Sequence, residues 1–126
     1  MPAVVPYLVV RDARGAIAWY GDVFGAVTVG DPYPDGDRVG HAELEIAGGT
    51  LYLADPYPEF GLEGPGAATP PVSLHLTVLD VDETMRRAET AGARVERPAT
   101  DEPYGRSGRL RDPYGHRWIV QEAEPS

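Results

Sequence analysis

The chain has 126 residues, with 20 acidic residues against 11 basic ones, all of them arginine, and a formal net charge of −9. This charge repels phosphate backbones and anionic lipids, so nucleic acids and membranes are not expected partners, and a cationic ligand is favoured over an anionic one. The absence of cysteine excludes disulfides, thiol catalysis and thiolate metal sites. No signal-peptide pattern opens the sequence and no apolar run approaches the roughly 20 residues of a membrane span, so we expect a cytoplasmic protein of one domain.

The first half of the chain has the pattern of a strand, a helix, a strand and a hairpin. Residues 4–10 are mostly apolar and predict a strand, and Asp12 is a candidate N-cap for the helix that follows. Apolar residues then recur at spacings of three and four until Gly25, which ends the helix. The remaining predicted elements are a strand at residues 26–30, a loop at 31–37, and strands at 40–46 and 50–54 around a turn at 47–49.

The second half repeats this pattern. Residues 72–78 predict a strand, and Asp80 followed by Glu83 resembles a capping box at the start of a helix. Asp, Pro and Gly at the first, second and fourth positions of Asp112–Gly115 predict a type I turn. The other predicted elements are a helix end at Gly92, a strand at 93–97, a loop at 100–107 and a closing hairpin at 108–120.

Equivalent positions in the two halves are separated by 67 or 68 residues. Asp12 corresponds to Asp80 and Gly40 to Gly108 at 68 residues, whereas Gly25 corresponds to Gly92 at 67. We therefore predict a tandem repeat of β-α-β-β-β modules, module one at 1–55 and module two at 72–126, joined by a linker at 56–71. Each module alone is small, so we expect them to share a sheet or core, within the chain or between chains.

These motifs together resemble the vicinal oxygen chelate superfamily, which includes glyoxalase I, extradiol dioxygenases, fosfomycin-resistance enzymes and bleomycin-resistance proteins. The resemblance implies an α+β fold whose curved mixed sheets cup a ligand, usually in a homodimer. A dimeric ferredoxin-like barrel is the alternative fold, but the hairpin after each helix and strand favours the first. The motifs are Val10-Arg11-Asp12, Trp19-Tyr20, Phe24-Gly25-Ala26, Asp80-Val81-Asp82 and Asp112 to Trp118.

Metal-using members of that superfamily hold the ion with side chains from the first and last strands of each module. Alignment on the strand ends places these positions at Val5, Tyr52, Ser73 and Ile119, and none of the four is a good ligand for a divalent cation. A slip of two residues would bring His75 to the third position, but one histidine does not make a site. We therefore predict no metal and no other cofactor.

Alternation along the strands predicts which side chains face the ligand. On residues 40–46, for example, His41, Glu43 and Glu45 lie opposite the apolar Ala42 and Leu44. The resulting cup is polar and aromatic, which suits an extended organic ligand with flat rings. The candidate ligand-binding residues are Tyr7, His41, Glu43, Tyr52, His75, Tyr104, Arg109 and Arg111.

Several candidates have two interpretations. His41 and Glu43 are either an acid–base pair or polar residues on the wet face of a sheet. Arg109 and Arg111 either pair with glutamates of the equivalent hairpin, Glu43 and Glu45, or recognise an anion. The aromatic and proline-rich segments 31–37 and 55–60 are either lids over the cup or disordered loops.

Three functions follow from these observations. The first is a homodimeric, metal-free binding protein that sequesters a bulky, aromatic or cationic natural product such as an antibiotic. The second is a metal-independent isomerase, lyase or cyclase that uses His41 or His75 with Glu43 for proton transfer. The third is a metal enzyme with a displaced site built from these same three residues.

Overall fold

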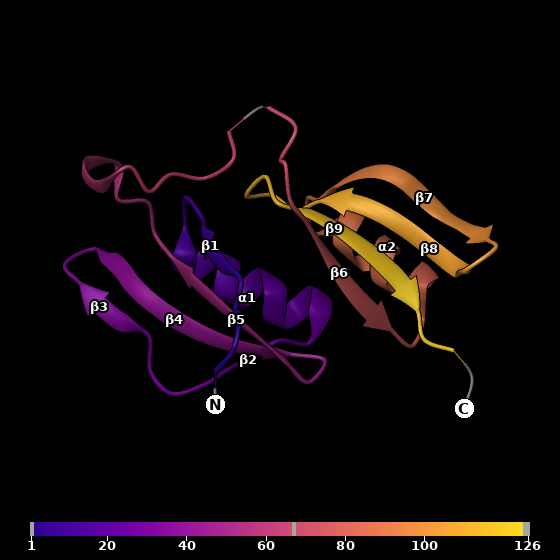
Figure 1. Ribbon diagram of the computed structural model, residues 1–126, viewed down its shortest axis with the longest axis horizontal. Coiled ribbons are helices and arrows are strands. Elements are labelled where there is room, and N and C mark those ends of the chain that lie inside the picture. The colour runs from indigo at the N-terminus through magenta and orange to yellow at the C-terminus, as the bar shows by residue number, and fades with distance from the viewer. Residues whose placement is uncertain (1, 67, 125–126) are drawn as a thin grey trace. The chain divides into compact units, whose positions relative to one another are not determined.

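The computed structural model describes residues 2–66 and 68–124, which form two compact units at 1–64 and 65–126 (Figure 1). The boundary between the units lies inside the segment 56–71 that the sequence predicts as a linker. Each unit is one β-α-β-β-β module, so the predicted α+β fold of two tandem modules is confirmed. No helix in these two ranges is both long enough and apolar enough to cross a membrane.

Unit one is a mixed sheet with a single α-helix packed on one face. The strand order is β1-β5-β4-β2; β1 runs parallel to β5, and β3 adds to β4 beside this path. Its core is aliphatic and aromatic, with Val10, Tyr20, Leu44 and Leu53 fully buried. The elements are β1 (Tyr7–Val9), α1 (Ala13–Phe24), β2 (Val27–Thr28), β3 (Tyr33–Asp35), β4 (Arg38–Ile46), β5 (Gly49–Ala54) and a 3₁₀ turn, η1 (Pro58–Phe60).

Unit two repeats this plan with a longer first strand and a longer strand after the helix, and its sheet bends across α2 (Figure 1). The strand order is β6-β9-β8-β7, with β6 parallel to β9 and the other pairs antiparallel. Val81 and Ala88 of the helix are buried, as are Leu110 and Val120 of the sheet. The elements are β6 (Ser73–Val78), α2 (Val81–Thr90), β7 (Arg94–Glu102), β8 (Gly105–Arg111) and β9 (Arg117–Glu122).

The predicted N-caps of both helices and the predicted end of α1 are confirmed, whereas α2 ends at Thr90, with Ala91 and not Gly92 as its C-cap. Asp12 accepts a hydrogen bond from the Gly15 amide at 3.1 Å, and α1 ends at Gly25 in the left-handed conformation (φ 73°) that glycine adopts without strain. Asp80 likewise accepts from the Glu83 amide at 3.1 Å. Glu83 does not return the bond as a capping box would, because its carboxylate pairs with Arg86 at 2.5 Å.

Each module also ties its helix to its last strand through a carboxylate. Asp55 accepts from the Ala13 amide at 2.8 Å, and Glu122 accepts from the Val81 amide at 3.2 Å. These amides open the two helices and have no partner within the helix, so an outside acceptor satisfies them. The helix starts are 68 residues apart and the carboxylates 67, the same offsets that revealed the repeat.

This contact gives a first prediction, that Asp55→Asn destabilises the protein by about 1–2 kcal/mol. One Asp55 oxygen accepts from Ala13 and the other from the Val39 amide at 2.6 Å, so an asparagine NH₂ would face one of these donors. Denaturant unfolding measures the loss. Asp22→Asn, on the exposed side of α1, is the matched control and should change stability by less than about 0.5 kcal/mol. Equal stability of both variants would contradict the contact.

Two segments predicted as loops contain regular structure, so the loop predictions for 31–37 and 55–60 were wrong in part. Residues 33–35 form β3, and residues 58–60 form η1. Side chains connect the two segments: the Tyr57 hydroxyl donates to Asp35 at 2.6 Å, and Arg38 pairs with Glu59 at 2.7 Å. These long-range contacts stabilise proline-rich segments whose local sequence favours turns.

The loop predicted at 100–107 was also largely wrong. Strand β7 continues to Glu102 and β8 begins at Gly105, so only two residues connect them. Within residues 100–107 these strands lack the alternation of apolar and polar residues by which a strand is predicted. Ion pairs across the hairpin, such as Arg106 with Asp101 at 3.1 Å, stabilise them.

Candidate functional site

The sheet face of unit one opposite α1 carries the predicted polar and aromatic side chains. Ala42 and Leu44 are buried, whereas His41 and Glu43, which alternate with them, are partly exposed. In the strand register Tyr52 lies directly between its neighbours Tyr7 and Glu43, so these three occupy one row across the sheet. The alternation of residues 40–46 predicted from the sequence is therefore confirmed.

Three of the predicted site residues, Tyr7, His41 and Tyr52, form an aromatic cluster on this face. The His41 and Tyr52 ring centroids are 4.8 Å apart, and Tyr7 lies 5.4 Å from His41 and 5.7 Å from Tyr52, all edge to face. The Tyr7 hydroxyl lies 2.7 Å from His41 Nδ1. Edge-to-face rings with polar rims form a surface on which a flat organic ring can pack.

The Tyr7 hydroxyl can serve either protonation state of His41. It has one proton, and it lies near both His41 Nδ1 and the Gly40 carbonyl oxygen, at 2.7 and 3.4 Å. With a neutral ring the hydroxyl donates to Nδ1; with a charged ring Nδ1–H donates to the hydroxyl, which turns its proton toward Gly40. Burial raises the pKa of Tyr7, so the hydroxyl keeps its proton at neutral pH. In the described residues His41 thus hydrogen-bonds a neighbour on the sheet, Tyr7, which is a contact that the sequence did not predict.

The equivalent face of unit two is rich in arginine. Across strands β6, β9, β8 and β7 one row reads Ser73, Arg117, Arg111, Arg94, and the next reads His75, Ile119, Arg109, Arg97. Of the predicted candidates, His75 and Arg109 therefore share a row, and Arg111 lies in the row beside it.

His75 is held by a short hydrogen-bonded chain. Gln121 donates from its side-chain amide to the Tyr104 carbonyl oxygen at 2.9 Å, and its own oxygen lies 3.0 Å from His75 Nε2. A carbonyl oxygen only accepts, so His75 Nε2 must carry a hydrogen and donate it to Gln121. In the neutral ring Nδ1 then has no hydrogen and is an acceptor. The chain also connects Tyr104, a predicted site residue in the β7–β8 turn, to the sheet.

One carboxylate, that of Glu96, lies at the centre of the arginines. Arg117 donates to it at 2.7 Å and Arg111 at 3.2 Å, while Arg109 and Arg94 approach it at 3.4 and 3.6 Å without a hydrogen bond. The hydrogen bond from Arg117, with the charges of the other arginines, lowers the pKa of Glu96. Within unit two, Arg109 and Arg111 thus have an ion-pair partner, Glu96, on the neighbouring strand β7.

A second carboxylate pairs with the remaining arginine of this face. Arg97 forms a short ion pair with Glu102 and donates to Ser107 at 2.9 Å. Hydrogen bonding with Tyr104, with the charge of Glu102, raises the pKa of Arg97. The sequence reading missed Glu96, Arg97 and Arg117, although the alternating Arg109, Arg111 and Arg117 around the last turn were a signal for them.

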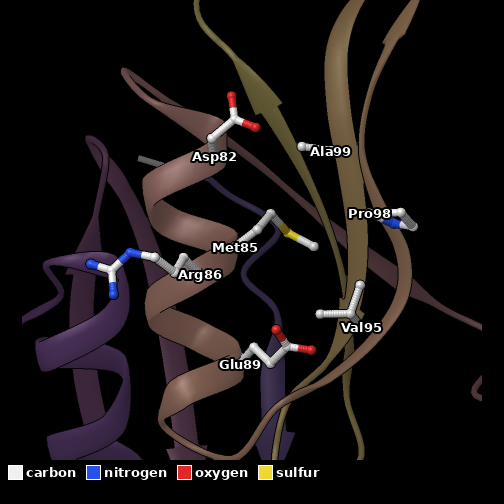
Figure 2. A pocket seen from close by; sticks show the side chains of 7 residues that line it. All are labelled: Asp82, Met85, Arg86, Glu89, Val95, Pro98 and Ala99. Atoms are coloured by element: carbon white, nitrogen blue, oxygen red, sulfur yellow. The ribbon is translucent and has the colours of Figure 1, made fainter.

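A pocket of about 280 Å³ lies on the other side of unit two, between α2 and β7 (Figure 2). Met85 forms its apolar floor together with residues of β7. Two of its charged lining residues are paired, Asp82 with Arg106 at 2.8 Å and Arg86 with Glu83. None of the predicted site residues lies in it. The lining residues are Asp82, Met85, Arg86, Glu89, Val95, Pro98 and Ala99.

The residues at the superfamily's metal positions do not fit a divalent cation. Val5 and Ile119 are hydrocarbon, and Tyr52 and Ser73 offer only hydroxyl groups. Asp80, Asp82 and Glu122 do bring carboxylate oxygens within 4.8 Å of one another, but at the start of α2 and not on the sheet face. Each of these three accepts a hydrogen bond from the chain, which accounts for their position.

Comparison with known proteins identifies the family. The chain belongs to the Glyoxalase/Bleomycin resistance protein/Dioxygenase superfamily, whose family model matches residues 3–120. An uncharacterized protein of Mycobacterium bovis is 44% identical over 127 residues, covering 94% of this chain and 82% of that protein. The resemblance inferred from the sequence is therefore confirmed.

Solved structures share the fold. The crystal structure of TioX from Micromonospora sp. ML1 is 27% identical, with a TM-score of 0.68 over 99% of this chain and 98% of that one. The fosfomycin resistance protein FosX from Listeria monocytogenes is 15% identical, with a TM-score of 0.70 over 98% and 92%. These likenesses extend over both modules, and the superfamily hosts more than one activity on this fold.

Proposed function

We propose that the protein is a metal-independent small-molecule-binding protein that sequesters a bulky organic compound, such as an antibiotic natural product, as a homodimer. The observation that supports this most directly is the aromatic cluster of Tyr7, His41 and Tyr52 on an open sheet face. The positions where relatives with a metal would bind it offer no suitable ligand set, which favours binding without a metal.

The charge of unit one favours a basic group on the ligand. Residues 1–64 contain three arginines and ten acidic residues, a formal charge of −7. Glu43 lies in the same row as Tyr7 and Tyr52, so its carboxylate lies beside the aromatic cluster. A cation next to a flat ring gains from this carboxylate and from the faces of the tyrosines.

A second candidate function is a metal-independent isomerase, lyase or cyclase. It is favoured by the 2.7 Å contact between the Tyr7 hydroxyl and His41 Nδ1, which orients the imidazole as a proton-transfer group requires. Here Glu43 would be the second acid–base group. Replacement of His41 by glutamine would then lower the turnover rate far more than the affinity, whereas a binding protein has no turnover to lose.

Native mass spectrometry of protein purified without chelator tests the proposal first. It reports subunit number, bound metal and any organic adduct in one spectrum. Flat aromatic natural products, bleomycin among them, are then screened for binding and recovered. A dimer that returns its ligand unchanged supports sequestration; chemically altered ligand supports the enzyme, and a stoichiometric divalent metal contradicts both proposals.

For a ligand found in this screen, Tyr52→Ala is expected to weaken binding about tenfold. The variant removes the ring that contacts both Tyr7 and His41, and an aromatic contact of this kind is worth about 0.5–1.5 kcal/mol beyond its buried area. Titration calorimetry measures the change. Phe60→Ala, on an exposed ring of η1, is the control and should retain wild-type affinity. Equal weakening in both variants would place the ligand elsewhere.

A further inference from the structure

We infer that the arginine-rich face of unit two is a binding site for an anionic group, a carboxylate or a phosphate. This inference deepens the proposed function, because it supplies a chemical group of the ligand. The site consists of Arg94, Arg109, Arg111 and Arg117 around Glu96, with Arg97 in the adjoining row.

The cross-strand pairing brings like charges together. Arg111 is the direct neighbour of Arg117 on one side and of Arg94 on the other, and Arg109 is the direct neighbour of Arg97. Like charges opposite each other destabilise a sheet. Packing gives no reason for such rows on a partly exposed face, where a neutral polar residue would fit as well. A site for an anion gives one.

The carboxylates on this face are too few to neutralise its arginines or to accept all of their hydrogen bonds. A guanidinium has five N–H donors and a carboxylate about four lone-pair sites, so Glu96 cannot satisfy four arginines. The geometry agrees: among the described residues, Nε of Arg97, Arg109 and Arg111 is buried and has no hydrogen-bond partner. Five arginines against Glu96 and Glu102 leave a local charge of +3 within a chain whose net charge is −9.

The four arginines around Glu96 divide into an inner and an outer pair. Arg111 and Arg117 are 12% and 18% exposed and hydrogen-bond Glu96, so they position the carboxylate. Arg109 and Arg94 are 43% and 71% exposed, and each stays 3.4 Å or more from it without a hydrogen bond. The outer pair therefore keeps donors for a second anion, which would bind beside Glu96 and be held from two sides.

Binding of inorganic phosphate and of benzoate, followed by amide chemical shifts in low salt, tests this inference. We expect saturable shifts in β7 and β8 with millimolar affinity, the usual range for so small a ligand. Stronger binding of phosphate indicates a phosphorylated ligand, and stronger binding of benzoate indicates an organic acid. Either result supports the site, whereas no saturable shift up to about ten times that concentration overturns it.

Matched variants separate a local site from the overall charge. Arg109→Gln should weaken binding about tenfold, because it removes one charge-assisted contact. Arg86→Gln makes the same change of charge on the exposed side of α2 and should bind as wild type does. Equal weakening in both would overturn the inference. If Arg109→Gln fails to fold, Arg94→Gln replaces it. Phosphate has no ring, so its failure to bind would leave the proposed function at the aromatic cluster standing.

Discussion

Replacing Asp112 with alanine is expected to destabilise the protein by about 3–5 kcal/mol. This side chain is 4% exposed and accepts three hydrogen bonds: from the amides of Tyr114 and His116, at 2.9 and 3.0 Å, and from Trp118 Nε1 at 2.9 Å. Alanine would leave three donors without this acceptor, and each such buried donor costs about 1–3 kcal/mol. Denaturant unfolding measures the loss, and Asp31→Ala, in an exposed loop, is the control.

A double-mutant cycle tests the contact with the indole. In Asp112→Asn one carboxylate oxygen becomes an NH₂ group, which only donates. The asparagine side chain therefore cannot accept hydrogen bonds both from Trp118 Nε1 and from the turn amides. Trp118→Phe removes the indole N–H, so the double variant should be more stable than the sum of the single losses predicts. Strict additivity would show that this hydrogen bond does not contribute.

In the closing hairpin the turn could be predicted from the sequence, but the side-chain contacts across it could not. Asp, Pro and Gly in Asp112–Gly115 predicted the turn, and the Gly115 amide indeed bonds the Asp112 carbonyl at 3.0 Å. The local sequence pattern gives this aspartate a role in the turn alone. Its bond to Trp118, six residues away on the next strand, depends on how the hairpin folds back, and no local rule contains that.

The sequence predicts which side chains share a face of the sheet, but it does not predict their contacts. Alternation along a strand determines which side chains share a face, so His41, Glu43 and Arg109 were placed on the exposed face from the sequence. Their partners depend on register and bulges. Strand β7 shifts register between Val95 and Arg97, and Glu96, which lies in that bulge, pairs with the arginines of β8 and β9.

The second large effect is expected at Glu96: the variant Glu96→Gln should lower the free energy of unfolding by about 2 kcal/mol at pH 7. The change removes the charge that four arginines share, from a side chain that is only 11% exposed. Loss of one partner of a buried ion pair costs about 3–5 kcal/mol, and the exposed outer arginines reduce that cost here. Glu89→Gln, at an exposed carboxylate of α2 that pairs with none of these arginines, is the matched control and should be nearly neutral.

The pH dependence of stability should identify the charge as the cause. The arginines lower the pKa of Glu96 in the folded protein, so its stabilising contribution is fully present above the unfolded value, about 4.3, and is lost as the pH falls through the lower folded value. Stability curves of wild type and Glu96→Gln should thus converge in acid, whereas parallel curves would refute the ion pair. Phosphate should also stabilise Glu96→Gln more than wild type, because the variant leaves the arginines without their internal anion and an external anion takes its place.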